Sequence, residues 1–431
     1  MRTSTIVVIL LTLSCSGAQP SDSLPNVDLS VSPLSAENRK PLYARLVAAF
    51  DREYERHIQR NERRDFAEDF KVYYLRQELQ ALIDMWRATD ELSYLEQARK
   101  LVRNAIIDAK SNLKPLLANG RQRGTWPCFM SEAVAEQTGG HNQINDFQGA
   151  AGFLMVANAI EQAGQSGWRD IADFVETSIV EKWLMYPHAV WPSRLKGQDS
   201  IRYLLVALHS TRDKREHFAT ICMDLSALGY DEYPYAQWAQ FLTDLYVGIR
   251  QELNEPPPKP HQLGHDTPND WGLIPEEKSG GFTWYYRTSK KDIAILDTSH
   301  ANRTVWLALK AFHNNMVGRR IVDGLVNTLA LQIWKPKQSP FYFANIVDGS
   351  DRTVQGMPAG RKGNLWFGWH RLAAYDNELK NLFVSIAYDL TTGGQNIPKG
   401  AQNKGMENAP LCFYAWGSRL LSQEGTPKVF P

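Results

Sequence analysis

The sequence predicts an all-α protein built as a single α/α toroid, a ring of paired helices with long loops. Segments with a one-sided apolar stripe recur from Ala36 onward, as in 41–58, where Leu42, Leu46 and Phe50 share one helix face. Several segments directly follow a loop rich in glycine, polar and aromatic residues. Alternation of apolar and polar residues, which is typical of strands, is scarce.

Two sets of helices are expected. Helices that follow a polar loop are the candidates for the inner ring, and they cover 147–162, 200–209, 236–253, 304–314, 365–375 and 411–421. Other amphipathic helices are expected at 41–58, 66–86, 94–110, 168–183, 320–334 and 377–390. The loops before the inner helices then meet at one mouth of the ring. Phe341–Val347 is the best candidate for a short strand.

The toroid is expected to be one domain spanning 36–425. A chain of 431 residues with 43% hydrophobic content can bury a large core. The Pro-rich insert Asn254–Pro275 interrupts the helical pattern. Because helical hairpins are expected on both sides of it, we interpret this insert as a lid or rim loop.

The N-terminal segment 1–18 has the pattern of an export signal, with Arg2, a short apolar stretch and small residues. Cys15 follows Leu13-Ser14, which resembles a bacterial lipoprotein signal ending before a lipidated cysteine. Residues 19–35 are expected to form a flexible leader. The protein is therefore expected to be periplasmic, secreted or lipid-anchored at the cell surface, without a membrane span.

Charge and cysteine content exclude several classes of protein. The formal net charge is +1, so no global field indicates nucleic acid as a partner. The wide spacing of Cys128, Cys222 and Cys412 excludes a disulfide framework, and we expect buried free thiols. His261 and His265 lie in the Pro-rich insert without the helical setting of a zinc pair. No metal and no cofactor is expected.

Chemically active side chains are densest in the stretch 281–314. Tyr286 precedes a polar loop, and His300 and Arg303 are three residues apart, so they share a face of the next helix's first turn. Thr298 or Ser299 is the expected N-cap. Such a group suits proton abstraction from an acidic substrate. The structural alternative is a helix cap with a buried, hydrogen-bonded histidine.

A second group lies in Gly139-Gly140-His141-Asn142, just before another expected inner helix. Cleavage of a uronate polymer by β-elimination needs a donor that stabilises the charge developing on the carboxylate, and a base for the C5 proton. Asn142, His141, Tyr286, His300 and Arg303 supply these residue types and are the catalytic candidates. The alternative is that His141 and Asn142 only organise a glycine turn.

Basic and aromatic residues gather in the loops expected at the mouth. Locally basic loops in a nearly neutral chain fit an acidic polysaccharide, although they also serve solubility. Aromatic rings there can stack on sugars. The substrate-binding candidates are Trp126, Arg202, Tyr285, Asn302, Arg361, Trp366 and His370.

Three short motifs resemble polysaccharide lyase family 38, the alginate and glucuronan lyases. They are Trp126-Pro127, Gly-Gly-His141-Asn142 and Asp297-Thr-Ser-His-Ala-Asn302. The resemblance covers the chain from about Ala36 to the end. It implies an α/α toroid that cleaves a polyuronide by β-elimination, with an Asn–His pair before an inner helix.

Two alternatives to a lyase remain. A glycoside hydrolase on the same fold needs two opposed carboxylates, and its candidates are Asp146, Asp199, Asp231 and Asp297. A non-catalytic sugar-binding lipoprotein needs the aromatic and basic loops but neither His300 nor a tyrosine base. Product analysis separates these functions, because only a lyase makes unsaturated ends that absorb in the ultraviolet.

Overall fold

Helices make up most of the described residues in this computed structural model. Those residues are 32–60, 71–115, 122–126, 141–185, 204, 208, 212–249, 272–288, 293–338, 341–351, 365, 367–393 and 409–422. The α-helices are α1 (Ala36–Arg60), α2 (Lys71–Thr89), α3 (Leu92–Ser111), α5 (Gln143–Gln162), α6 (Trp168–Val175), α7 (Glu181–Met185), α9 (Arg212–Ala227), α10 (Tyr235–Val247), α11 (Thr298–His313), α12 (Arg319–Asn327), α13 (Asn377–Thr391) and α14 (Ala409–Ser422). A π-helical turn, η1 (Glu176–Val180), joins α6 to α7, another, η5 (Thr328–Ile333), extends α12, and η6 (Trp369–Ala374) is a 3-10 helix.

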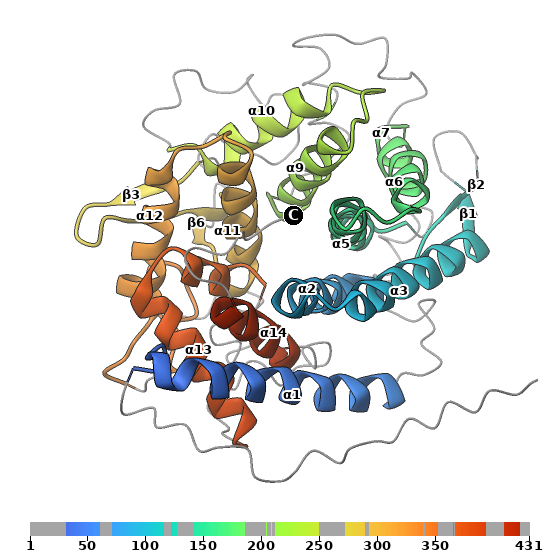
Figure 1. Ribbon diagram of the computed structural model, residues 1–431. Helices are drawn as coiled ribbons and strands as arrows, with labels where there is room; N and C mark the ends of the chain where they lie inside the picture. The colour runs from blue at the N-terminus through green and yellow to red at the C-terminus, as the bar shows by residue number, and fades with distance from the viewer. Residues whose placement is uncertain are drawn as a thin grey trace, which may run out of the picture.

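Among the described residues, five helices form an inner ring. In order around it, α2, α5, α9 and α11 pack one against the next, η6 bridges α11 to α14, and α14 closes the ring against α2. Helices α1, α3, α6, α10, α12 and α13 pack outside this ring, as Figure 1 shows. The predicted all-α toroid is confirmed.

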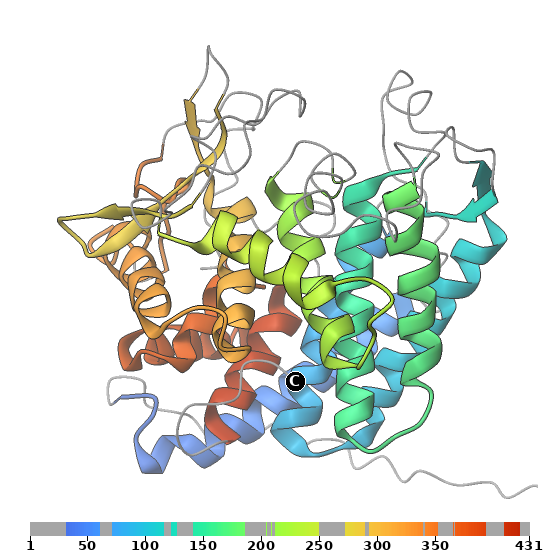
Figure 2. The same ribbon diagram turned by 90° about the horizontal axis from the view of Figure 1, so that it is seen from above.

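The first residues of α2, α5, α9 and α11 lie at one end of the ring, because each outer helix returns the chain before the next inner helix begins. We call this end the N-terminal mouth. Three short antiparallel hairpins lie there as well, and Figure 2 shows their strands at this end. They are β1 (Leu113–Pro115) with β2 (Gln122–Gly124), β3 (Ile274–Glu276) with β4 (Gly281–Thr283), and β5 (Tyr285–Thr288) with β6 (Ile293–Ile295).

The assignment of inner and outer helices differs from the prediction at α2, which was not among the expected inner helices but is one, and at α9 and α10. Helix α9 was not predicted, because its start, Arg-Asp-Lys-Arg-Glu-His217, has the composition of a solvated segment. In the structure α9 is an inner helix, and α10, predicted as inner over 236–253, packs outside α9 and α11 and ends at Val247. The loop before α10 therefore lies at the end of the ring opposite the N-terminal mouth.

Several smaller predictions were wrong. Residues 32–35, placed in the flexible leader, form a hydrogen-bonded turn with Leu34 packed on the core. The predicted helix 365–375 is only the short η6, and Phe341–Val347 makes isolated bridges and no strand. None of the strands β1 to β6 was predicted. Segment 1–18, the rest of the leader, most of the Pro-rich insert and most of 200–209 lie outside the described residues.

Helices α2 and α5 pack closely against each other in the core. Nearly every side chain of α5 is buried, and a Cβ at Gly149 would lie 2.4 Å from Val72, so glycine there allows the two helices to approach. Cys222 and Cys412 are free and buried, as predicted. Within the described ranges, no helix is long and apolar enough to cross a membrane.

Replacing Gly368 by alanine should destabilise the ring where η6 docks on α11. A Cβ at Gly368 would lie 2.2 Å from the carbonyl oxygen of Asn302, whose side-chain oxygen also accepts hydrogen bonds from the Gly368 and Trp369 amides. We expect Gly368→Ala to lower the free energy of unfolding by about 2 kcal/mol, measured by urea denaturation. The control is Gly318→Ala, where no atom lies within 4 Å of the added carbon. Equal stability of the two variants would contradict this account.

Candidate functional site

A layer of four polar side chains lies just inside the N-terminal mouth. Arg76, Gln148, His217 and Arg303 come from α2, α5, α9 and α11, and all four are buried. His217 contacts the other three: its Nδ1 lies 3.1 Å from Nη1 of Arg76, and its Nε2 lies 3.1 Å from both Gln148 Oε1 and Arg303 Nε. We call this group the His217 cluster.

His217 is held in its neutral form. Burial lowers the pKa of His217 well below its usual value, and the positive charges of Arg76 and Arg303 lower it further. A neutral imidazole has one nitrogen that accepts and one that donates. It therefore accepts a hydrogen bond from one guanidinium at a time, and when Nδ1 accepts from Arg76, the N–H on Nε2 can donate to Gln148.

A tyrosine at the mouth completes the cluster. Tyr73 is half-buried near the start of α2, and its hydroxyl oxygen accepts a hydrogen bond from Nη2 of Arg303. The same Nη2 lies 3.2 Å from Gln148 Oε1, and the guanidinium carbon lies 5.8 Å from the Tyr73 ring centre. The cluster thus places a phenol oxygen against a cation where the ring opens.

His300 lies one turn before Arg303 on α11, and an aspartate orients it. Asp297, not Thr298 or Ser299, is the N-cap of α11, because its Oδ1 accepts from the His300 amide at 3.0 Å. Its Oδ2 lies 2.6 Å from His300 Nδ1. Burial raises the pKa of Asp297, but the charge and hydrogen bonds of His300 outweigh burial, so the pKa is below its usual value. An ionised carboxylate therefore holds the imidazole by Nδ1.

The Gly-Gly-His-Asn motif has a structural role in large part. Asn142 is the N-cap of α5, and its Oδ1 accepts from the amides of Ile144 and Asn145. This cap uses the oxygen and not the side-chain NH₂, and Asn142 remains half-buried at the mouth. His141 is fully buried, 3.3 Å from the carbonyl of Lys114 and edge-on to Trp183, which contradicts a catalytic role in direct contact with substrate.

Three of the substrate-binding candidates lie in the core, which corrects their prediction. Trp126 packs edge-on to Phe153 and Phe174, so neither ring face is available to a sugar. Asn302 is buried and binds η6 as described above. His370 is buried among aromatic rings, with Nδ1 3.1 Å from the carbonyl of Leu365, and burial lowers its pKa well below the usual value.

Of the other substrate-binding candidates, Tyr285 lies at the mouth, and the rest lie outside the described residues. Tyr285 is half-buried in β5, and its carbonyl accepts from Arg212 at 3.5 Å. Arg212 in turn pairs with the buried Glu216 at 2.7 Å, whose carboxylate accepts from Thr304 of α11 and so fixes α9 against α11. Arg202, Arg361, Trp366 and the side chain of Tyr286 lie outside the described residues.

Four residues of the site, Tyr73, Arg76, Gln148 and His217, were not predicted from the sequence. One signal was present for Arg76, a single arginine within the apolar face formed by Val72, Leu75 and Leu79. The other three looked like ordinary helix residues. Their importance comes from four helices meeting at the same level, which no single helix reveals.

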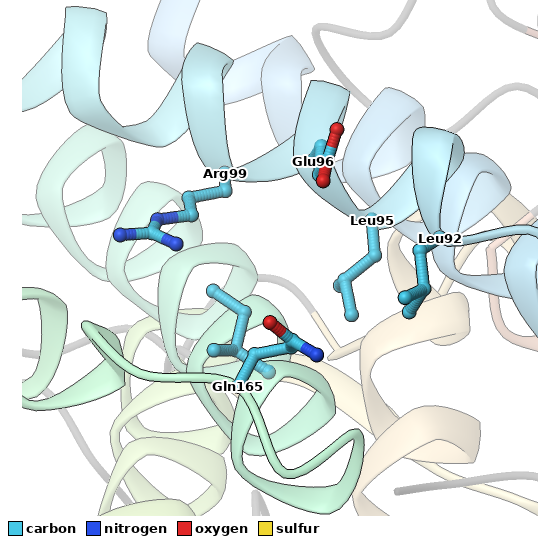
Figure 3. A pocket seen from close by; sticks show the side chains of 6 residues that line it. Leu92, Leu95, Glu96, Arg99 and Gln165 are labelled. Atoms are coloured by element: carbon cyan, nitrogen blue, oxygen red, sulfur yellow. The ribbon is translucent and has the colours of Figure 1, made fainter.

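A surface hollow lies elsewhere. It is lined by Leu92, Leu95, Glu96, Arg99, Ile160 and Gln165, between the start of α3 and the end of α5, and Figure 3 shows the labelled side chains around it. Because α3 starts where α2 ends, this hollow is at the end of the ring opposite the N-terminal mouth. It is therefore separate from the His217 cluster.

Comparison with known proteins gives limited information. No protein-family model and no curated protein sequence matches the chain. One similar solved structure is an inactive variant of the alpha-1,6-mannanase GH76A of Salegentibacter sp. HEL1_6 in complex with alpha-1,6-mannotriose. It is 11% identical, with a TM-score of 0.46, over 82% of this chain and 90% of that chain. Likeness at this level says nothing about the substrate of this protein, and the relation to polysaccharide lyase family 38 stays a prediction.

The neutral state of His217 should make stability depend on pH. In the unfolded chain histidine binds a proton below pH ~6.5, whereas folded His217 does not, so the unfolded state binds more protons and stability falls as pH drops below that value. We expect wild type to lose roughly 1 kcal/mol more than His217→Gln for each pH unit below ~6.5. Urea unfolding at several pH values measures this. The buried His370 contributes the same pH dependence to wild type and to His217→Gln. Identical pH slopes of the two proteins would therefore contradict the neutral state of His217.

Proposed function

We propose that the N-terminal mouth binds an acidic polysaccharide and cleaves it by β-elimination. The observation that carries this proposal is the half-buried Tyr73 hydroxyl, held by the Arg303 guanidinium at the opening of the ring. The phenol oxygen is placed where it can act as a general base on a substrate in the mouth. The same cation can stabilise negative charge on a substrate.

The electrostatics of the mouth favour an anionic substrate. Arg76 and Arg303 lie in one layer, joined by the neutral His217. The helices α2, α5, α9 and α11 also direct their N-terminal, partially positive ends to the mouth. A uronate carboxylate is an anion of suitable charge for such a site, whereas a neutral sugar gains nothing from these charges.

The reaction then assigns a step to each group. Tyr73, ionised, takes the proton from C5 of the uronate while Arg303 stabilises the charge that moves onto the carboxylate. The C4–O bond to the leaving sugar breaks and a C4=C5 double bond forms. His300, oriented by Asp297, gives a proton to the leaving oxygen. The amide of Asn142 supplies a further donor at the mouth. Tyr286, the base predicted from sequence, is replaced in this scheme by Tyr73.

The hydrolase alternative has less support among the described carboxylates. Asp146 is buried, 2.5 Å from Lys182 Nζ and 2.6 Å from Trp183 Nε1. Asp231 lies at the opposite end of the ring, and Asp199 is outside the described residues. Asp297 is at the mouth but pairs with His300. Of the four aspartates predicted for a hydrolase, only Asp297 is placed at the mouth.

Tyr73→Phe should lower turnover on a polyuronide by about 10²–10⁴-fold with the fold intact, because a general base is lost. The assay follows the ultraviolet absorbance of unsaturated ends with alginate and glucuronan as substrates. Tyr74→Phe is the matched control, since Tyr74 is the neighbouring half-buried tyrosine on the same helix and packs edge-on to Tyr73. Its activity should stay near that of wild type.

Other outcomes identify the alternatives. Cleavage that releases reducing ends without ultraviolet absorbance would establish a hydrolase and exclude the elimination mechanism. Polymer binding without any cleavage would favour a sugar-binding protein. Full lyase activity in Tyr73→Phe would show that another residue, such as Tyr286, is the base.

A further inference from the structure

Arg76 is a buried charge with a distinctive set of contacts. Its side chain is 1% exposed, and its guanidinium carbon lies 4.7 Å from the Trp306 ring centre and 5.3 Å from that of Phe367. Only Nη1 has a hydrogen-bond partner among the described residues, which is Nδ1 of His217. Neither Nε nor Nη2 has an acceptor in this part of the chain.

Several buried cations elsewhere in the ring are paired with carboxylates. Asp84 binds Arg371 and lies 2.7 Å from Arg419, and Asp224 binds Lys310. Asp224 also acts on Arg76 electrostatically, but its carboxylate is already engaged by Lys310 and by Asn158 at 2.7 Å. Burial, and then the charge of Arg303, lower the pKa of Arg76 to about 9, so the guanidinium remains charged near neutral pH.

The geometry of the two remaining donors points to a class of ligand. Nε–H and Nη2–H lie on the same edge of a guanidinium and run parallel, which matches the two oxygens of one carboxylate. A buried charge with unsatisfied donors costs several kcal/mol unless an acceptor is supplied. Arg76 is also three residues after Tyr73 on α2, so the two residues share a face of that helix about one turn apart.

We propose that Nε and Nη2 of Arg76 bind a carboxylate, or an inorganic anion of similar size, at the floor of the N-terminal mouth. The anion comes either from solution or from a uronate of the substrate. The site itself does not depend on polysaccharide cleavage, whereas assigning it to a uronate rests on the proposed function. In that case Arg76 would hold a carboxylate in the same layer as Arg303.

Thermal unfolding with sodium formate tests the site, with total sodium kept constant by methanesulfonate. We expect the Tm of wild type to rise with formate and to follow a binding curve, by about 1 °C or more per tenfold increase above the dissociation constant. Arg76→Met, which keeps the length and removes the charge, should abolish this rise. Arg319→Met is the control, because Arg319 is an exposed arginine paired with Asp323, and it should respond as wild type does.

Two results would overturn the proposal. One is a wild-type Tm that does not respond to formate. This result would reject the anion site even if Arg76→Met failed to fold, because it does not depend on the variant. The other is an unchanged formate response in Arg76→Met. A second titration with free glucuronate identifies the source: competition with formate assigns the site to substrate, and no competition assigns it to a solution anion. A formate response in a protein that cleaves no polyuronide would separate failure of the proposed function from failure of this site.

Discussion

The contact on which the mouth of the ring depends is a neutral histidine between two buried arginines. His217 contacts residues of α2, α5 and α11 from its place on α9, so one imidazole sets four inner helices at a common level. Its neutrality is a consequence of burial and of the two guanidinium groups it contacts. A protonated imidazole there would add a third buried positive charge.

This arrangement differs from the rest of the polar interior. Toward the C-terminal ends of the inner helices, buried cations meet carboxylates, as in the contacts of Asp84 with Arg371 and Arg419. At the mouth, Arg76 and Arg303 meet an imidazole, an amide and a phenol. Acceptors without charge leave the local field positive. The two arginines of the His217 cluster therefore differ from the ion-paired cations deeper in the ring.

The sequence predicted the fold class and the positions of most helices, because apolar periodicity depends only on local spacing. It failed at α9, where Arg212 to His217 have the composition of an exposed segment but are largely buried, since the interior of this ring is polar. That omission shifted α10 to the wrong layer and placed Asp231 at the wrong end.

The candidate site was predicted in part. Arg303, His300 and Asn142 lie at the mouth, because a helix start with polar side chains is visible in sequence. The predicted roles of Trp126, His141 and His370 were wrong. A polar or aromatic residue near a loop can either face a ligand or fill the core, and only packing decides which of these it does. Tyr73 and His217 required long-range contacts, between residues separated by 230 positions in the case of Tyr73 and Arg303.

The central claim, a neutral His217 at the proposed substrate site, is tested most directly by ¹⁵N NMR of histidine side chains, with His217→Gln to assign the signals. At pH 5.5 His217 should show one pyridine-like and one pyrrole-like nitrogen, and both shifts should change when a uronate oligosaccharide is added. Two pyrrole-like nitrogens at that pH would contradict the account. Binding of the saccharide without any change in the His217 shifts would also contradict it, because the saccharide would then bind elsewhere on the protein.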